Sequence, residues 1–391
     1  MKVGVLGGGQ LARMLAQAGR SLGVACRFLS PDPHACATSF GEHLCVAYDD
    51  PDGQRRLADW ADVLTYEFEN VSVAAVESLE RLRPMYPSSL ALAASRDRLV
   101  EKRRFQALGL ATAEFRAVET LAELRLAAED MGLPAILKSR MQGYDGKGQT
   151  LVRHPTDLPA AWDTVGRVPS ILEAVVPFDR ELSIIAARAR TGETVFYPVS
   201  ENHHRQGILR LSLSRAGDVM QAQAESMIHR LLCDLDYVGV LALELFQVGD
   251  RLLANEMAPR VHNSGHWTIE AAPTSQFENH LRAICGFPLG ATAPIQRAAM
   301  VNLIGDPPPA SAITAIAGTS HHVYGKAARP GRKVGHVTLT GRPGESELFE
   351  RRLTRLLQIA GVPELAWQGS TGPPEPDAGH GSVPATDMAG P

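Results

Sequence analysis

Two glutamates, Glu244 and Glu256, lie on either side of a predicted hairpin turn at Gly249-Asp250, and their spacing predicts a metal site. If the chain reverses at that turn, the two residues face each other across antiparallel strands, on one face of the sheet. Carboxylates about 4 Å apart repel each other by roughly 4 kcal/mol at an effective dielectric of about 20. A hard divalent cation removes this repulsion, so we predict a magnesium site that serves a nucleotide triphosphate. The alternative is two solvated glutamates on strands whose register differs by one residue.

Two glycine-rich segments are candidates for binding phosphate groups. Residues 7–12 fit the G-x-G-x-x-G/A pattern between a predicted strand and a predicted helix, and Asp32 lies about 20 residues downstream. This pattern is typical of a dinucleotide site, of another phosphate site at a helix N-terminus, or of a structural tight turn, and the residues leave these alternatives open. Residues 142–149 form a glycine-rich hairpin loop around Lys147. We expect this loop to close over phosphates, and a flexible surface hairpin is the alternative.

Three charged residues lie at the ends of predicted apolar strands. A buried ammonium at Lys138 needs an anionic partner, unless its amine reaches solvent at the strand end. Glu173 is placed to hydrogen-bond a ribose or an adenine amino group, and Glu181 begins the next strand. Taken singly, each glutamate is also compatible with a surface charge.

Two further clusters suit anions. Arg260, His262 and Asn263 fall within four residues, with His266 nearby, and a cation, an imidazole and an amide so close suit an oxyanion such as bicarbonate or an acyl phosphate. A satisfied helix-cap network is the alternative. Residues 324–333 form a basic loop that suits a substrate phosphate, with a solvated loop as the alternative.

The composition indicates a multidomain protein with a large core. The chain has 391 residues, of which 45% are hydrophobic and 21% are charged, and its formal net charge of −4 argues against nucleic-acid binding. Its five cysteines are odd in number and contain no C-x-x-C pair, so neither a disulfide framework nor a zinc knuckle is predicted. No run reaches 18 apolar residues and no apolar signal core follows the N-terminus, so we expect a cytoplasmic protein without membrane partners.

The elements that must position these residues follow from the hydrophobic periodicity. The first ninety-odd residues predict an α/β unit with a parallel sheet, in which strand, glycine turn, helix and strand follow in order. Its expected strands are 2–6, 24–29, 44–47 and 63–66, with helices over 10–22 and 73–82. Residues 95–97 are expected to cap an Arg/Lys-rich helix that runs to residue 107 and begins a second domain.

The second domain is predicted to be α+β, and a small third domain follows it. Its expected strands are 135–138, 150–152, 171–175, 181–187 and 194–198, with helices near 120–131, over 221–235 and over 276–284. The third domain is expected to contain strands 299–303, 321–324 and 335–339 and a helix over 346–359. The Pro/Gly-rich end has almost no large apolar side chains and predicts a disordered tail. The expected division is therefore 1–94, 95–295, 296–368 and a tail at 369–391.

In this order of elements the chain resembles the ATP-grasp superfamily. Within it the chain is similar to the family of 5-(carboxyamino)imidazole ribonucleotide synthases of de novo purine synthesis, and the resemblance runs from residue 1 to about 367. The motifs that carry it are Gly9-Gln10-Leu11-x-Arg13-Met14, Gly143-Tyr144-Asp145-Gly146-Lys147-Gly148, Asn255-Glu256-x-Ala258-Pro259-Arg260-Val261-His262-Asn263-Ser264-Gly265-His266-Trp267, and Arg329-Pro330-Gly331-Arg332-Lys333-Val334-Gly335-His336. Ala12 stands where a glycine is expected, and the tail has no counterpart in the family.

The resemblance implies an ATP-grasp fold and a ligase that carboxylates the exocyclic amine of 5-aminoimidazole ribonucleotide. Bicarbonate attacks the γ-phosphate of ATP to give carboxyphosphate, and ADP and phosphate are the other products. The family also implies a homodimer and Mg²⁺, or Mn²⁺, held by Glu244 and Glu256.

The site residues implied by the resemblance fall into three groups. ATP is expected to meet Arg98, Lys138, Gly143, Tyr144, Asp145, Gly146, Lys147, Gly148, Gln149, Glu173, Glu181, His204, Asn255 and Glu256. The ribonucleotide is expected to meet Gly9, Gln10, Leu11, Glu67, Lys326, Arg332 and Lys333. The catalytic group is expected to comprise Arg260, His262, Asn263, Tyr144 and Asp145.

Three alternatives remain open. A sibling ATP-grasp ligase would differ in its acceptor, such as glycinamide ribonucleotide or biotin. An NAD-dependent oxidoreductase would use the first glycine turn as its cofactor site, but it leaves the two glutamates of the hairpin unexplained. A non-catalytic nucleotide-binding protein is a third possibility, and the presence of every expected ligand residue argues against it.

Overall fold

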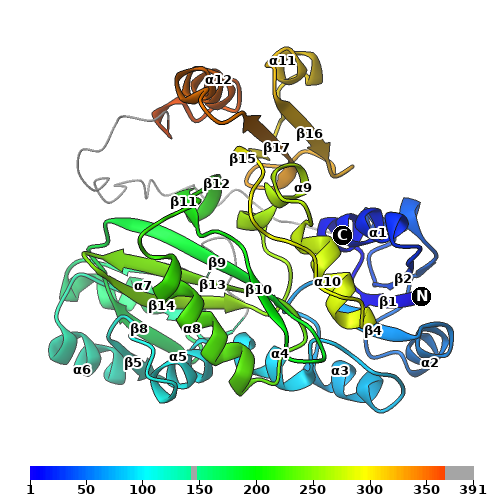
Figure 1. The fold of residues 1–391 in the computed structure, drawn as a ribbon. Helices are drawn as coiled ribbons and strands as arrows, with labels where there is room; N and C mark the ends of the chain where they lie inside the picture. The colour runs from blue at the N-terminus through cyan, green and yellow to red at the C-terminus, as the bar shows by residue number, and fades with distance from the viewer. Residues whose placement is uncertain (142–147, 366–391) are drawn as a thin grey trace, which may run out of the picture.

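Three β-sheets organise the chain, and helices cover them (Figure 1). The structure is a computed structural model, and it describes residues 1–141 and 148–365. Most of the predicted glycine loop, Gln142 to Lys147, lies outside the described residues, as does the predicted tail at 369–391. No helix in the described part of the chain is both long and apolar enough to cross a membrane.

The N-terminal sheet is parallel, with strand order β3-β2-β1-β4. Helices connect its strands, and β1 and β4 carry almost only buried side chains, which is typical of a parallel sheet covered on both faces. This confirms the predicted fold class of the unit and the bounds of two of its strands. The elements are β1 Lys2–Leu6, α1 Gln10–Ser21, β2 Ala25–Leu29, β3 His43–Leu44, α2 Pro51–Trp60, β4 Val63–Tyr66, α3 Val73–Glu80 and α4 Ser89–Arg96.

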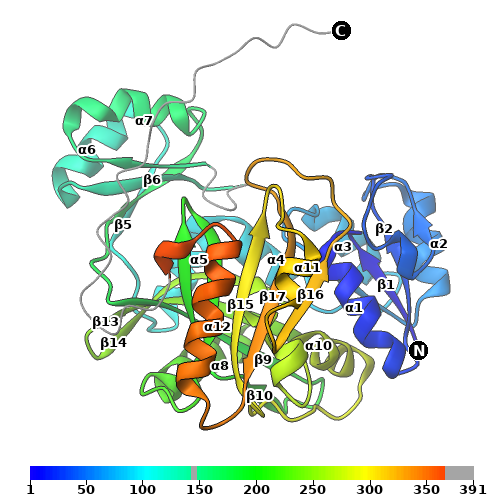
Figure 2. The same ribbon diagram turned by 90° about the horizontal axis from the view of Figure 1, so that it is seen from above.

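A four-stranded antiparallel sheet with order β5-β8-β6-β7 follows. Asp97 caps the helix that leads into it, because its carboxylate accepts hydrogen bonds from the backbone N–H groups of Leu99 and Val100. The elements are α5 Arg98–Ala107, β5 Phe115–Val118, α6 Leu121–Met131, β6 Ala135–Ser139, β7 Gln149–Val152, α7 Leu158–Thr164 and β8 Ser170–Ala174. In Figure 2 this unit projects from the rest of the molecule, with α6 and α7 on its outer side.

The largest sheet has nine strands in the order β14-β13-β9-β11-β12-β15-β17-β16, with β10 paired to β9. Because β12 pairs with β15, the C-terminal strands extend this sheet. The predicted boundary at residue 295, between the second and third domains, stays a prediction. Its elements are β9 Arg180–Arg188, β10 Thr194–Phe196, β11 Ser200–Arg205, β12 Ile208–Ser214, α8 Gln221–Asp234, β13 Gly239–Val248, β14 Arg251–Ala258, α9 Thr268–Ala271, α10 Gln276–Cys285, β15 Arg297–Ile304, α11 Ala310–Thr314, β16 Thr319–Val323, β17 Lys333–Gly341 and α12 Ser346–Ile359.

The predicted register of the β13–β14 hairpin is wrong near the turn. A register with Glu244 opposite Glu256 would pair Val248 with Leu252. In the structure Val248 pairs with Arg251 and Leu245 with Ala254, so the strands are shifted by one residue here. A register shift between Leu243 and Leu245 then restores the expected pairing, because Leu243 pairs with Met257. Glu244 therefore lies opposite two residues, Asn255 and Glu256, at a bulge. Bulges re-aim side chains and are common beside active sites.

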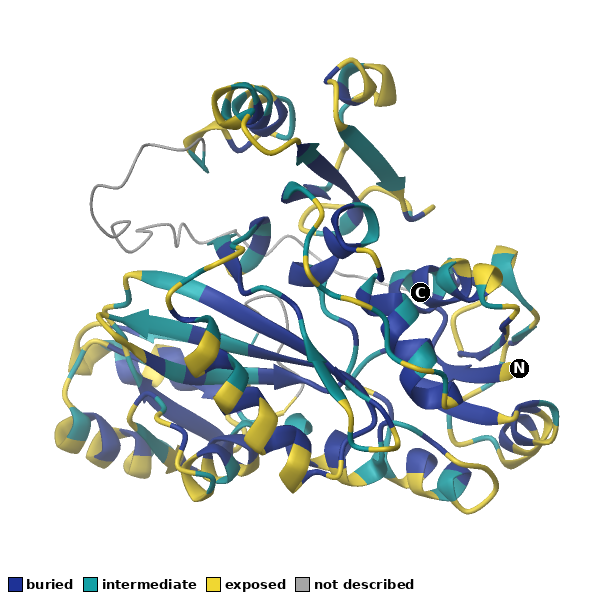
Figure 3. Ribbon diagram, viewed as in Figure 1, coloured by how far each residue is buried: buried dark blue, intermediate teal, exposed yellow. Residues whose placement is uncertain are grey.

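Helix α10 joins the N-terminal sheet to the large sheet. Phe277, Leu281 and Ile284 lie in one buried cluster with residues of α1 and β13. His280 links the two sheets, because its Nε2 lies 2.9 Å from Thr65 Oγ1 on β4 and its Nδ1 accepts the Val240 N–H of β13. Figure 3 shows buried colour along much of the strands, and exposed colour mainly on the outer faces of the helices and on loops.

Candidate active site

A buried cluster of charges forms where α5 meets the four-stranded sheet. Arg98 and Lys102 are four residues apart, so they lie on one face of α5. Lys138 Nζ on β6 donates a 2.9 Å hydrogen bond to Glu173 Oε2 on β8, and Lys102 Nζ lies 3.5 Å from the same oxygen. The prediction that Lys138 needs an anionic partner is therefore confirmed.

This cluster holds more positive than negative charge. Burial raises the pKa of Glu173, but Lys138 and Lys102 outweigh that effect and lower the pKa to about 2. Burial lowers the pKa of Lys102 more than Glu173 raises it. Among the described residues, neither Lys102 Nζ nor Glu173 Oε1 has a hydrogen-bond partner. A buried donor and a buried acceptor are thus both left for a polar ligand.

The two hairpin carboxylates each have a cationic or imidazole partner. Arg98 Nη1 lies 2.9 Å from Glu256 Oε2, and His262 Nε2 lies 3.2 Å from Glu244 Oε1. Burial raises the pKa of Glu256, but Arg98, followed by Lys138 and His262, lowers it to about 2. His262 thus acts on both carboxylates, which indicates that they face a common region.

These carboxylates fit a magnesium ion with oxygen ligands. No group of three or more His, Cys, Asp or Glu side chains suited to a metal occurs within residues 1–141 and 148–365. Mg²⁺ usually takes one or two carboxylates together with substrate phosphates and waters, so two glutamates and a nucleotide match its requirements.

Glu101, on the same helix α5 as Arg98, supports the β14 strand. Its carboxylate accepts a 2.7 Å hydrogen bond from the Met257 backbone N–H. Burial and the neighbouring Glu256 raise the pKa of Glu101 to about 8. Glu101 therefore holds a proton more readily than a free glutamate, whereas the pKa of the neighbouring Glu256 is lowered.

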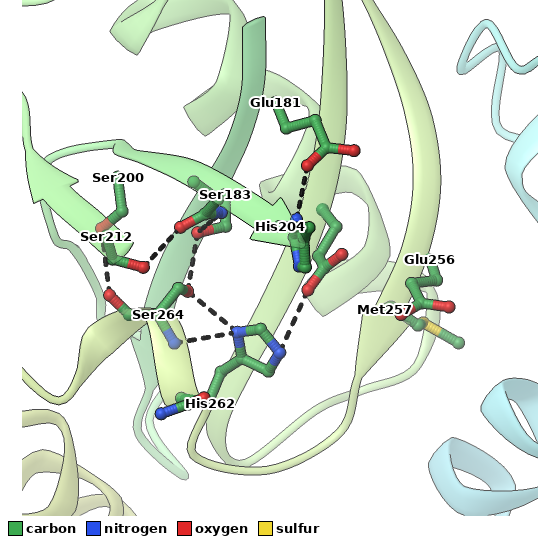
Figure 4. Close-up of polar contacts among 12 residues, drawn as sticks. Glu181, Ser183, Ser200, His204, Ser212, Glu256, Met257, His262 and Ser264 are labelled. Atoms are coloured by element: carbon green, nitrogen blue, oxygen red, sulfur yellow. Dashed lines mark hydrogen bonds and ion pairs between the residues drawn. The ribbon is translucent and has the colours of Figure 1, made fainter. Parts of the chain in front are cut away.

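Glu181 on β9 and His204 on β11 form an ion pair at the side of the site (Figure 4). Burial lowers the pKa of His204, but the Glu181 carboxylate outweighs it and raises the pKa to about 9. Lys333, the first residue of β17, acts in the opposite direction on the same pKa.

The Arg260 segment lies at the junction with the N-terminal sheet. Arg260 Nη2 lies 2.7 Å from Glu69 Oε1, and Asn263 exchanges hydrogen bonds with Asn302 on β15. His266 does not join the predicted oxyanion cluster, because its ring is fully buried beside His336. Burial holds the pKa of His266 well below its usual range, so it supplies no charge to the site.

The first glycine turn approaches a carboxylate of its own chain. Glu67 accepts hydrogen bonds from the backbone N–H groups of Gly9 and Ala12, the latter at 2.7 Å. A Cβ at Gly7 or Gly9 would lie within 3 Å of this side chain, which explains why glycine is needed there. Glu67 thus uses two of the backbone donors at this turn, and the expectation that the turn binds a ligand phosphate stays a prediction.

Other predicted substrate residues gather at the same turn. The Lys326 amine donates to Gln10 Oε1, which joins the loop before β17 to α1. Burial lowers the pKa of Lys326. The Leu11 side chain instead packs in the core, so only its backbone faces any ligand. Arg332 donates to the Ala327 carbonyl and shapes its own loop.

The structure brings most of the predicted residues together and adds others. Gly148 and Gln149 are the described members of the glycine loop, and Gln149 pairs with Lys138 across β6 and β7. Sequence reasoning missed Lys102 and Glu69. Lys102 could have been found from its position one helical turn after Arg98, whereas Glu69 had no signal beyond its place after a strand.

Three family models match successive parts of the chain. Residues 1–96 match the ribonucleotide synthetase preATP-grasp domain, and residues 103–277 match the ATP-grasp domain. Residues 298–347 match the phosphoribosylaminoimidazole carboxylase C-terminal domain.

Individual relatives match over nearly their full length. The N5-carboxyaminoimidazole ribonucleotide synthase of Pseudomonas aeruginosa is 53% identical over 339 residues, which cover 87% of this chain and 94% of the relative. The crystal structure of the synthetase from Thermus thermophilus has a TM-score of 0.88 and 51% identity, covering 94% of this chain and all of that one. The Aspergillus clavatus synthase in complex with ADP and 5-aminoimidazole ribonucleotide has a TM-score of 0.84 and 32% identity, covering 92% and 98% of the two chains.

Proposed function

The chain belongs to the ATP-grasp family of N5-carboxyaminoimidazole ribonucleotide synthases, and we propose that its site uses ATP and bicarbonate to carboxylate 5-aminoimidazole ribonucleotide. It is an ATP-dependent ligase that forms a carbon–nitrogen bond at the exocyclic amine. The structural observation that carries the site assignment is Glu256, which pairs with Arg98 and lies in the field of Lys138 and His262. An anionic carboxylate among the cations that a triphosphate requires supports the proposed role of Glu256 as a metal ligand.

The reaction has two steps. A bicarbonate oxygen attacks the γ-phosphorus of ATP, the bond to the β-phosphate oxygen breaks, and ADP leaves. The exocyclic amine then attacks the carbonyl carbon of carboxyphosphate, phosphate leaves, and the amine gives up a proton. Phosphoryl transfer depends on positioning and charge neutralisation more than on a protein nucleophile, which agrees with a site of cations and carboxylates.

Residues at one end of the site bind ATP, and residues at the other end meet the carboxyphosphate and the ribonucleotide. Arg98 and Lys138 neutralise phosphate charge, Glu173 and Glu181 receive the adenosine hydrogen bonds together with His204, and Asn255 lies beside the metal carboxylates. Arg260, His262 and Asn263 face the carboxyphosphate, while Gln10, Lys326, Arg332 and Lys333 receive the ribonucleotide. Tyr144 and Asp145 lie outside the described residues, and we propose that they meet the carboxyphosphate or the ribonucleotide.

Glu244 and Glu256 would hold Mg²⁺, with Mn²⁺ as a substitute. When bound, the ion would neutralise negative charge on the triphosphate. Arg98 keeps the Glu256 carboxylate ionised before any metal arrives, since its pKa is about 2.

The glycine turn does not support the NAD-dependent alternative. Glu67 already accepts the Gly9 and Ala12 amide hydrogens at the helix N-terminus. A dinucleotide pyrophosphate would need those donors and would meet a carboxylate there. Glu67 and Gly9 are instead proposed to shape the substrate end of the site.

An acceptor test decides the substrate. ADP release is measured with ATP, Mg²⁺ and bicarbonate, first alone, then with 5-aminoimidazole ribonucleotide, and then with glycinamide ribonucleotide. We expect only the aminoimidazole nucleotide to couple ATP turnover to stoichiometric phosphate release. The assignment would be contradicted if glycinamide ribonucleotide coupled ATP turnover, or if the rate of ADP release were the same with and without either acceptor. A homodimer and a cytoplasmic location are further proposals, and light scattering of the purified chain tests the first.

A further inference from the structure

A row of buried polar side chains crosses the large sheet beneath His262. Its members are Ser183 on β9, Asn202 on β11, Ser212 on β12 and Ser264, which lies in the short helix η3 (Asn263–Gly265); each is at most 4% exposed. Strand pairing explains the alignment, because Ser183 pairs with Glu244 and Asn202 pairs with Ser212. Buried hydroxyls and amides are unfavourable unless they are hydrogen-bonded, so the row needs internal partners.

The side chains form one continuous chain of hydrogen bonds that ends on the imidazole of His262 (Figure 4). Ser212 Oγ donates to Asn202 Oδ1 at 2.7 Å, and Asn202 Nδ2 donates to Ser183 Oγ at 3.0 Å. Ser183 Oγ donates to Ser264 Oγ at 2.7 Å, and Ser264 Oγ lies 2.8 Å from His262 Nδ1. Ser264 Oγ accepts the Ser183 proton and keeps its own proton to donate, and the neighbouring Ser264 backbone N–H, which also points at Nδ1, identifies Nδ1 as the acceptor.

Two groups with fixed roles set the donor-to-acceptor direction of this chain of hydrogen bonds. The backbone N–H of Ser264 cannot transfer its proton, and it points at His262 Nδ1 over 3.4 Å. At the other side of the ring, Nε2 faces the Glu244 carboxylate, which accepts hydrogen bonds. The geometry therefore makes Nδ1 an acceptor and places the ring proton on Nε2.

Gln276 holds the backbone of the same residue. Its Oε1 accepts the His262 N–H at 2.9 Å, and its Nε2 donates to the His262 carbonyl at 2.6 Å. Gln276 is fully buried at the start of α10. With the backbone fixed by Gln276 and Nδ1 fixed by Ser264, the ring has little freedom to turn away from Glu244.

We propose that Ser183 and Ser264 are positioning residues for the carboxylation reaction, which hold His262 as the Nε2–H tautomer so that it orients Glu244. The inference rests on the proposed function only for the role of Glu244 as a metal-holding carboxylate. In this arrangement His262 is a hydrogen-bond donor in the resting enzyme, and it has no free nitrogen with which to act as a base on the ribonucleotide amine.

The test compares Ser264→Ala and Ser183→Ala with Ser170→Ala. Ser170 is equally buried and donates to the Val168 carbonyl, but it belongs to β8 and has no contact with this row. Nitrogen-15 spectra of ring-labelled histidine in the ligand-free protein, with His262→Gln to assign the signal, report the tautomer without any need for turnover. We expect a protonated Nε2 and an unprotonated Nδ1 in the wild type and in Ser170→Ala, and a mixture of tautomers in Ser264→Ala.

Kinetics then test the consequence. In Ser264→Ala we expect kcat to fall about tenfold, equivalent to about 1.4 kcal/mol, with KM for ATP unchanged, and a smaller fall in Ser183→Ala. A wild-type signal with the proton on Nδ1, an unchanged His262 signal in both alanine variants, or an altered tautomer with unchanged kcat would overturn the proposal. Failure of 5-aminoimidazole ribonucleotide to support ADP release would instead refute the proposed function, and the spectra would still decide the tautomer.

Discussion

Removal of the Lys102 amine should stabilise the ligand-free protein while it weakens nucleotide binding. Lys102 Nζ is 3.5 Å from Glu173 Oε2, an attraction of about 5 kcal/mol at an effective dielectric of about 20. Lys138 Nζ is 2.9 Å from the same oxygen, so the two amines are at most about 6.4 Å apart. Their repulsion is then at least about 2.6 kcal/mol, which leaves a net attraction of at most roughly 2 kcal/mol.

This net attraction does not offset the loss of hydration. An ammonium buried in a protein loses several kcal/mol of hydration, and Lys102 is 1% exposed with no hydrogen-bond partner among the described residues. Glu101 attracts the Lys102 ammonium less than an ordinary carboxylate would, because burial and Glu256 raise the pKa of Glu101. Lys102→Met keeps the stem of the side chain, and Glu173 keeps Lys138 as its partner. We therefore expect the free energy of unfolding to rise by about 1 to 2 kcal/mol.

Urea unfolding and calorimetric titration with ADP and Mg²⁺ measure the two effects. We expect ADP to bind roughly tenfold more weakly to Lys102→Met, since one cation of the site is lost. Lys138→Met is the matched control, because it removes the hydrogen-bonded amine and should lower stability. If Lys102→Met lost more than about 1 kcal/mol of stability while Lys138→Met lost none, the assigned charge balance would be refuted.

Three other predictions concern the metal carboxylate, the core histidine and the substrate loop. Glu256→Gln should abolish ATP turnover in the ADP-release assay while circular dichroism stays unchanged, and normal turnover would remove Glu256 from the metal site. Burial lowers the pKa of His280 from 6.5 to about 4, so the folded protein should lose up to roughly 3 kcal/mol of stability as pH falls from 6.5 to 4, since the unfolded chain binds the proton more readily. His280→Gln should flatten that dependence in urea unfolding between about pH 4.5 and 7, and an equal slope in both proteins would contradict the assignment. Lys326→Met should raise KM for the ribonucleotide at least tenfold and leave KM for ATP unchanged, whereas an equal rise in both would point to a general folding defect.

Hydrophobic periodicity was sufficient to predict most of the framework from sequence. Strands β1 and β4 and helix α12 have the expected bounds, because each has an unambiguous apolar pattern between clear turn or capping residues. Strands β11 and β12 were not predicted. The sequence Ser200–Arg205 is polar and resembles a loop, yet it forms a strand because its side chains bond to neighbouring strands and to η3.

The sequence by itself determined which chemical groups are present: the two hairpin glutamates, the strand lysine and the cation–imidazole–amide run, with a family resemblance to assign their roles. Tertiary structure decided how these groups are used, since partners such as Lys102 with Glu173, Glu69 with Arg260 and Glu67 with the glycine turn are distant in sequence or lack a local pattern. The bulge at Glu244 also arises only from strand pairing. Periodicity reports which face of an element is buried, whereas the charge state and orientation of a side chain depend on what packs against that face.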